Sequence, residues 1–178
     1  MDVGKYKFKE FMDLAQWLHS FPAPGILIGG FMVEKAKSAV PKDTLYEAFV
    51  ETGKCLPDAV QLLTPCSFGN GWMRVVNLGR YALSLYDKYT GRGIRAYLDI
   101  DKLDEWPEIR AWFLKEKPKQ EQDSDKLLRE IEHAGDSYCT LQEICIADSY
   151  FNRKKMSATN ICPVCGESYP EADGPICR

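Results

Sequence analysis

Cys55-Leu-Pro-Asp-Ala-Val-Gln-Leu-Leu-Thr-Pro-Cys-Ser-Phe-Gly-Asn-Gly-Trp-Met73 is the stretch around which the other elements of this chain are most easily placed. Pro57 and Asp58 suit the first turn of a helix, where an N–H group is not needed and a carboxylate meets the positive end of the dipole. Pro65 ends this helix after about two turns. The pattern predicts Cys55 at the helix N-terminus, where the dipole favours the thiolate over the thiol.

Cys55 and His19 are the candidate catalytic residues. A thiolate at Cys55 is a suitable nucleophile, and a histidine is the usual base beside one. Two other interpretations stay open: His19 fits the C-terminus of the first helix, where its protonated form meets the negative dipole end. Asp58 fits a simple helix cap, and its negative charge would oppose thiolate formation at Cys55.

The loop after this helix is a candidate ligand-binding segment. Its glycines permit positive φ values or a close backbone approach, and its N–H groups could surround an anion. Cys66 also fits a buried thiol beside the loop, and Gln61 faces this region only if the helix face is assigned correctly. The candidate ligand-binding residues are Asp58, Gln61, Cys66, Ser67, Gly69 and Asn70.

The composition indicates a globular protein with a metal or thiol function. The 178 residues include 45% hydrophobic residues, and the net charge of −3 makes nucleic acid an unlikely partner. The dense basic run Arg153-Lys154-Lys155 suits either a basic patch or a solvated hairpin tip. The N-terminus lacks a signal-peptide core, and no apolar run is long enough for a membrane span, so we expect a cytoplasmic protein. Seven cysteines in that compartment favour metal binding over disulfides.

Periodicity and turn residues predict an α+β fold. Gly29 and Gly30 lie inside a predicted helix, where each costs about 1 kcal/mol against alanine, which indicates close packing against another backbone. We expect one domain at 1–137, with a mainly antiparallel sheet flanked by helices, and a small cysteine-rich domain at 138–178. The further helices are predicted at 6–21, 26–40, 104–117 and 118–133, and the strands at 44–52, 72–78, 82–88, 94–100, 139–151 and 156–161.

The last 17 residues contain a predicted zinc site of the treble-clef or ribbon type. Cys162-x-x-Cys165-Gly places two thiolates on a tight turn, and Cys177 supplies a third. So small a tail could hardly bury enough core to fold without its metal. For the fourth ligand, the chain offers Cys139, Cys145 and His133, with a water or another chain as alternatives. Rubredoxin-like iron would need two complete knuckles, so zinc is favoured.

Residues 55–73 resemble the family of the E-subunit of formylmethanofuran dehydrogenase (FmdE-like), which has the pattern Cys-x-x-Asp-Ala-x-Gln-x-x-x-x-Cys-Thr-x-Gly-Lys-Gly-Asn. Seven of these positions match: Cys55, Asp58, Ala59, Gln61, Cys66, Gly69 and Gly71. The family's first motif, similar to Phe-His-Gly-His-x-Cys-Pro-Gly, corresponds to residues 18–25. His19, Pro24 and Gly25 match it, whereas Phe21 replaces a histidine and Ala23 a cysteine. The resemblance implies a metal or active-site cluster at these two motifs and a cysteine finger after the α+β domain.

The resemblance implies an accessory metal-binding protein associated with molybdenum or tungsten enzymes of one-carbon metabolism. Its metals would be zinc in the finger and a second metal or small ligand near Cys55. Two other functions stay open: a thiol-dependent enzyme that uses Cys55, and a zinc-finger module that binds another protein. The glycine-bearing second helix and exposed strand edges also suit a homodimer.

Overall fold

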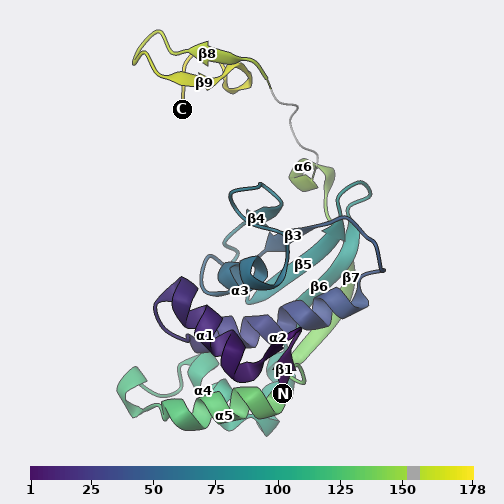
Figure 1. Ribbon diagram of the computed structural model, residues 1–178, viewed down its shortest axis with the longest axis vertical. Coiled ribbons are helices and arrows are strands. Elements are labelled where there is room, and N and C mark those ends of the chain that lie inside the picture. Colours follow the sequence, from purple (N-terminus) through teal and green to yellow (C-terminus); the bar gives the residue numbers. More distant parts are fainter. Residues whose placement is uncertain (152–156) are drawn as a thin grey trace. The chain divides into compact units, whose positions relative to one another are not determined.

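The computed structural model describes residues 1–151 and 157–178, and the chain divides into two compact units (Figure 1). The first unit is Met1–Ile146 and the second is Ala147–Arg178. The basic run Arg153-Lys154-Lys155 lies outside the described residues. In the described ranges, no helix combines the length and apolarity needed to cross a membrane.

An antiparallel-dominated sheet forms the centre of the first unit, as the sequence predicts. Within the described residues it has the strand order β4-β3-β5-β6-β7, and only the β3–β4 pair is parallel. Strand alternation sends the apolar side chains of the central strands to one face, where Ala48 pairs with Leu85 and Leu83 pairs with Ala96. The strands are β3 (Tyr46–Val50), β4 (Met73–Val75), β5 (Ala82–Asp87), β6 (Arg92–Leu98) and β7 (Cys139–Cys145).

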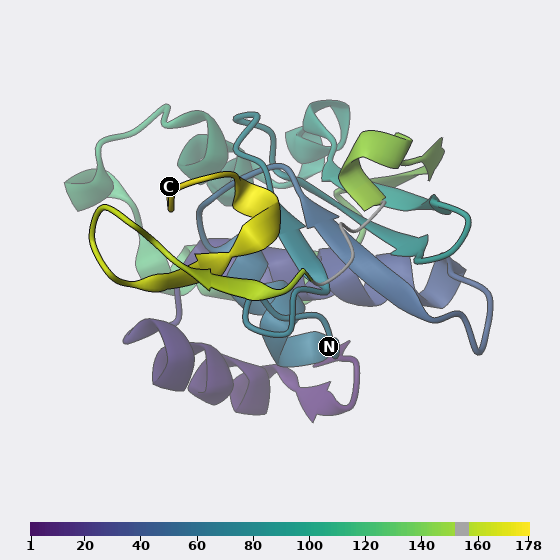
Figure 2. The ribbon, with the colours of Figure 1, turned by 90° about the horizontal axis from the view of Figure 1, so that it is seen from above.

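Three helices pack on that apolar face, and α2 (Pro24–Ala39) lies against the strands themselves. Figure 2 shows α1 (Phe8–His19) and α3 (Leu56–Leu63) on the same side of the sheet as α2. A second pair, α4 (Pro107–Leu114) and α5 (Ser124–Ala134), packs together, and α5 also contacts α2. The mixture of helices and a mainly antiparallel sheet confirms the predicted α+β class.

Helix α2 is so tightly enclosed that its glycines are required for packing. A Cβ atom added to Gly29 would lie 2.8 Å from Leu56 Cδ1 and 3.0 Å from Ala59 Cβ, both on α3. An added Cβ on Gly30 would overlap the Phe11 ring of α1. The predicted close approach of another element at these glycines is confirmed.

Two predicted helices begin later than the sequence pattern suggested. A short hairpin, β1 (Asp2–Val3) with β2 (Tyr6–Lys7), replaces the first turn of the helix predicted at 6–21. The helix predicted at 104–117 is divided, because Pro107 disfavours helical geometry at Trp106. A 3₁₀ helix, Ile100–Glu105, therefore precedes α4, and Trp106 adopts φ −128° and ψ 70°.

The boundary between the units falls after Ile146, so the boundary predicted at 137/138 is corrected. Residues 139–145 form β7, which pairs along its whole length with β6 and therefore belongs to the main sheet. The strand predicted at 139–151 ends at Cys145, and Asp148–Phe151 form the short helix α6. Hydrophobic content alone did not separate a sheet strand from the start of the cysteine-rich tail.

The second unit contains little secondary structure. Its described part includes a hairpin of β8 (Thr159–Ile161) and β9 (Ser168–Pro170), followed by a 3₁₀ turn, Glu171–Asp173. In this part only two side chains, Cys162 and Tyr169, are buried hydrophobic residues. So small a core agrees with the expectation that a metal ion stabilises the tail.

We predict that Gly29→Ala lowers the free energy of unfolding by up to about 2 kcal/mol, because overpacking costs about 1–3 kcal/mol and alanine recovers about 1 kcal/mol of helix propensity. Urea denaturation measures the change. Gly69→Ala is the control, since an added Cβ there would meet no atom within 4 Å. A Gly29→Ala variant as stable as the wild type would contradict the packing argument.

Candidate functional site

Cys55 lies in a strained turn at the start of α3. Its backbone has φ 55° and ψ −51°, and the N–H of Leu56 donates to the carbonyl of Lys54 at 2.5 Å. These values define a γ-turn of the rare kind with positive φ, which a residue with a Cβ atom adopts at a cost. The predicted position at the helix N-terminus is confirmed, and the strain marks Cys55 as a candidate functional residue.

A pocket of about 340 Å³ lies in front of this turn. It joins the C-terminal end of α1 to the first turn of α3. Its lining consists of His19, Gly53, Lys54, Cys55, Pro57 and Asp58. The structure thus brings both candidate catalytic residues and one candidate ligand-binding residue to a single pocket.

His19 and Asp58 form a hydrogen-bonded pair at this pocket. His19 Nδ1 lies 2.8 Å from Asp58 Oδ2, and the two side chains are 27% and 29% exposed. A carboxylate acceptor favours the tautomer with hydrogen on Nδ1, so that Nε2 carries the lone pair. A carboxylate that orients a histidine in this way is the usual outer support of a metal-binding imidazole.

The predicted thiolate at Cys55 is wrong for the metal-free protein. Burial raises the pKa of the Cys55 thiol, and the negative charge of Asp58 raises it further, against a smaller opposing effect of Lys54. Desolvation and a neighbouring carboxylate thus outweigh the helix dipole. Cys55 is therefore a thiol, not a preformed thiolate nucleophile.

Tyr81 is a site residue that the sequence patterns did not reveal. Its hydroxyl donates to the carbonyl of Gly25, at the start of α2. A Cβ atom added to Gly25 would lie 3.0 Å from Cys55 Sγ and 3.1 Å from Tyr81 Oη, so the thiol and the phenol flank the same point. Burial, with the nearby Cys55 and Asp58, raises the pKa of Tyr81 well above its usual range. It follows no motif because it is brought there by strand pairing.

The two motif positions with other residue types lie close to the site. Phe21 packs its ring against His19, with centroids 5.1 Å apart, and is half exposed. Ala23 is buried, just before α2. Neither side chain can bind a metal, so cysteine, histidine and aspartate side chains supply the acidic and imidazole groups of the described pocket.

The other candidate ligand-binding residues form a separate loop that binds itself. The N–H of Ser67 donates to Asn70 Oδ1 at 3.1 Å, and that of Phe68 donates to Gln61 Oε1 at 3.2 Å. Asn70 also donates from Nδ2 to the carbonyl of Pro65 at 2.7 Å. Because its side chains already bind these N–H groups, the loop is poorly suited to surround an anion.

Cys66 and Gly69 do not belong to the pocket either. Cys66 is fully buried, its Sγ lies 3.6 Å from the carbonyl of Tyr46, and burial raises its pKa to about 11. This agrees with the alternative of a buried structural thiol. Gly69 has no atom within 4 Å of an added Cβ, so its position is open.

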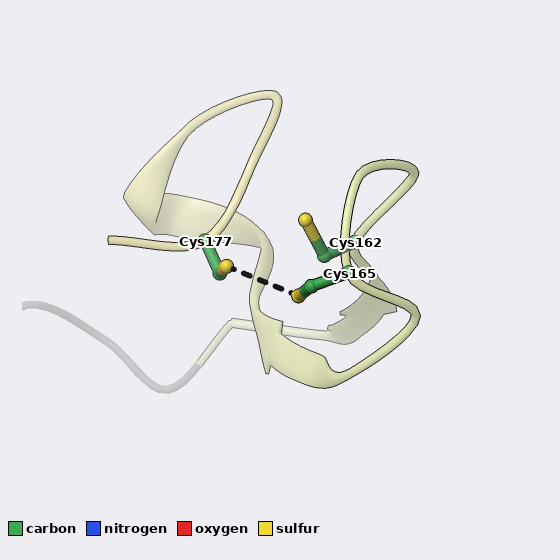
Figure 3. Close-up of side chains that lie close together, drawn as sticks. All are labelled: Cys162, Cys165 and Cys177. Carbon is green, nitrogen blue, oxygen red and sulfur yellow. Dashed lines mark hydrogen bonds between the residues drawn. The ribbon is translucent and has the colours of Figure 1, made fainter.

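In the second unit, three cysteines converge as the sequence predicted. Figure 3 shows Cys162, Cys165 and Cys177 with their sulfur atoms facing one another, and these atoms all lie within 4.8 Å of one another. The Sγ atoms of Cys165 and Cys177 are 3.5 Å apart. Zinc–sulfur bonds of about 2.3 Å in a tetrahedron place sulfur atoms about 3.8 Å apart, so the arrangement fits three corners of a zinc site.

Backbone hydrogen bonds prepare this cluster for a cation. The N–H of Gly166, which has φ 77°, donates to the carbonyl of Cys162 and closes the knuckle. N–H groups of Cys177, Cys165 and Val164 lower the pKa of Cys162 to about 6. Hydrogen bonding to the neighbouring sulfurs raises the pKa of Cys177 to about 11, because several thiolates without a cation repel one another.

The candidates for a fourth ligand occupy different surroundings in the first unit. Cys139 is fully buried in β7, and burial raises its pKa to about 11. His133 packs its ring on Trp106, with centroids 5.9 Å apart, whereas Cys145 is exposed. The identity of the fourth ligand stays a prediction.

We predict that Cys55→Gly is more stable than Cys55→Ala by about 1 kcal/mol. A positive φ costs a residue with a Cβ about 1–3 kcal/mol, and glycine loses only about 0.4–1 kcal/mol through its freer unfolded chain. Urea denaturation measures both variants. The matched pair Lys54→Gly and Lys54→Ala should show the opposite order, because no positive φ is found at Lys54. Equal or reversed stabilities at Cys55 would remove the strained turn from the argument.

Two family models match the chain. The model described as "FmdE, Molybdenum formylmethanofuran dehydrogenase operon" matches residues 18–146, and the one described as "FmdE treble clef zinc finger" matches residues 153–178. The first range corresponds to most of the α+β unit, and the second includes the three-cysteine cluster. These matches support zinc as the metal of the finger.

Two proteins show related sequences. A probable S-adenosyl-L-methionine-binding protein of Archaeoglobus fulgidus is 34% identical over 83 residues, which are 47% of this chain and 20% of the relative, so the chain spans about a fifth of that protein. A crystal structure of an FmdE-like protein of tungsten formylmethanofuran dehydrogenase from Syntrophus aciditrophicus is 45% identical, with a TM-score of 0.90 over 99% of this chain and 92% of that one. The chain therefore belongs to the FmdE family, with an α+β domain followed by a treble-clef zinc finger.

Proposed function

We propose that this protein is a metal-binding accessory protein of molybdenum or tungsten enzymes in one-carbon metabolism, with a metal or small-ligand site at Cys55. One observation carries the site: the hydrogen-bonded pair of His19 and Asp58 borders the same pocket as the Cys55 thiol. Imidazole and thiolate are both ligands of zinc and related metals.

The number of donors defines what this site can do. Cys55 Sγ and His19 Nε2 are two ligands, whereas structural zinc sites use four and catalytic sites three with a water. A metal held by two protein groups is exchangeable and leaves positions for a small molecule. This suits the handling of a metal or ligand for another protein better than a permanent structural role.

The proposed association with dehydrogenase subunits is supported by the names of the matching family model and of the Syntrophus protein. The cytoplasm is the proposed compartment, because all seven cysteines are free thiols, as in reducing surroundings. The predictions of a homodimer and of no nucleic-acid partner stay predictions.

A specific observation favours a second function, in which the finger binds another protein. Ile161, Val164 and Ile176 are 73%, 79% and 49% exposed. Each lies next to a cysteine of the cluster, so zinc binding would fix their positions. Exposed apolar side chains that are held rigidly are suitable anchors for a protein partner. The thiol-enzyme alternative has less support, because burial and Asp58 oppose a thiolate at Cys55.

Metal content per chain, measured by mass spectrometry, tests the two sites. We expect one zinc per chain that is lost in Cys162→Ser and kept in Cys55→Ser. We expect a second, weaker equivalent that is lost in Cys55→Ser and bound about 10–100-fold more weakly in Asp58→Asn, which removes the charged acceptor of His19. Asp125→Asn, a change at an exposed aspartate of α5, is the matched control. A zinc titration in which Cys55→Ser and wild type are identical would refute the site at Cys55.

Affinity capture with the full chain tests the association. We expect molybdenum or tungsten dehydrogenase subunits to co-purify with the wild type and to be lost with Val164→Asp, which places a charge on the exposed apolar side chain. Thr159→Asp adds the same charge at another exposed position of the finger and should retain them. Zinc content should be unchanged in both variants. Absence of dehydrogenase subunits from the wild-type capture would argue against the association.

A further inference from the structure

A second cavity, of about 710 Å³, lies at the ends of β5 and β6. This volume is within the range of about 300–1,000 Å³ typical of small-molecule sites. Its described lining combines cationic, aromatic and apolar side chains and includes no aspartate or glutamate. The lining residues are Gly79, Arg80, Tyr81, Ala82, Arg95, Tyr97, Leu98, Ile100, Phe113 and Gln142.

Two guanidinium groups at this cavity share one carboxylate. Arg95 donates from Nε and Nη2 to the two oxygens of buried Glu51, at 2.5 and 3.0 Å. Arg80 reaches the same carboxylate with Nη1 at 3.7 Å, beyond hydrogen-bond distance, and its side chain is 68% exposed. Glu51 therefore neutralises Arg95, while Arg80 retains an excess positive charge at the cavity.

The walls of the cavity suit a flat group. The Arg95 guanidinium lies over the Tyr97 ring at 5.0 Å, and Tyr81 meets Phe113 edge-on at 6.0 Å. Aromatic faces and guanidinium planes stack on planar rings. Gln142, which pairs with Arg95 across β6 and β7, adds an amide that can both donate and accept.

We propose that this cavity binds a small anion that carries a planar ring, with Arg80 holding the anionic group and the aromatic residues holding the ring. Arg80 is the mobile partner, because its contact with Glu51 is long, whereas bidentate Arg95 forms a fixed wall. The proposal does not depend on a metal at Cys55. The two sites share only Tyr81, whose ring lines this cavity and whose hydroxyl is bound to Gly25.

Calorimetric titration of the full chain with phenyl phosphate tests the proposal. We expect one saturable site per chain, and binding about tenfold weaker in Arg80→Gln, because a hydrogen bond to a charged group is lost. Tyr97→Leu should also weaken binding. Arg129→Gln, a change at an exposed arginine of α5, is the matched control and should bind as the wild type does. Cys55→Ser should also leave binding unchanged, which separates this test from that of the proposed function.

The contrary outcomes are equally clear. Wild-type protein that shows no saturable heat with phenyl phosphate would overturn the proposal, as would an unchanged affinity in Arg80→Gln. Inorganic phosphate that binds as tightly as phenyl phosphate would overturn the assignment of a planar ligand. Urea denaturation of each variant checks folding, and exposed Arg80 can be replaced without opening the core.

Discussion

The close contact between α2 and α3 is the constraint on which the candidate site depends. At Gly25 and Gly29 the two segments approach so closely that a single added carbon would overlap the Cys55 turn or the α3 side chains. Helix α3 can therefore begin only through a sharp turn, and Cys55 occupies it despite its Cβ atom. The same contact brings Asp58 to the end of α1, where it meets His19.

Local sequence signals predicted the parts of the fold that local physics controls. Pro57 and Asp58 marked the first turn of α3, Gly29 marked close packing, and the Cys162–Cys165 spacing marked the knuckle. What could not be predicted depends on long-range contacts. Strand β7 joined the main sheet because β6 offered it a complete pairing edge. Tyr81 reached the site through strand pairing, and burial reversed the expected effect of the helix dipole on Cys55.

The two units of the chain solve the problem of stability in different ways. The first buries apolar side chains of a sheet and three helices, with fully buried residues such as Leu83 and Tyr138. The described part of the second has almost no such core and gathers three sulfur atoms instead. In the FmdE-type finger, metal binding and folding are therefore one process, and its fold depends on metal supply and on the redox state of its thiols.

Tyr81 links two places that can hold ligands. Its hydroxyl is bound at the start of α2 beside Cys55, and its ring forms a wall of the cavity that contains Arg80. A ligand that displaces this side chain from one place also changes the other. Thermodynamic linkage then requires reciprocity: whatever factor an occupant of the Arg80 cavity applies to affinity at Cys55, an occupant at Cys55 applies in return. One phenol thus gives the domain a means of coupling two binding equilibria.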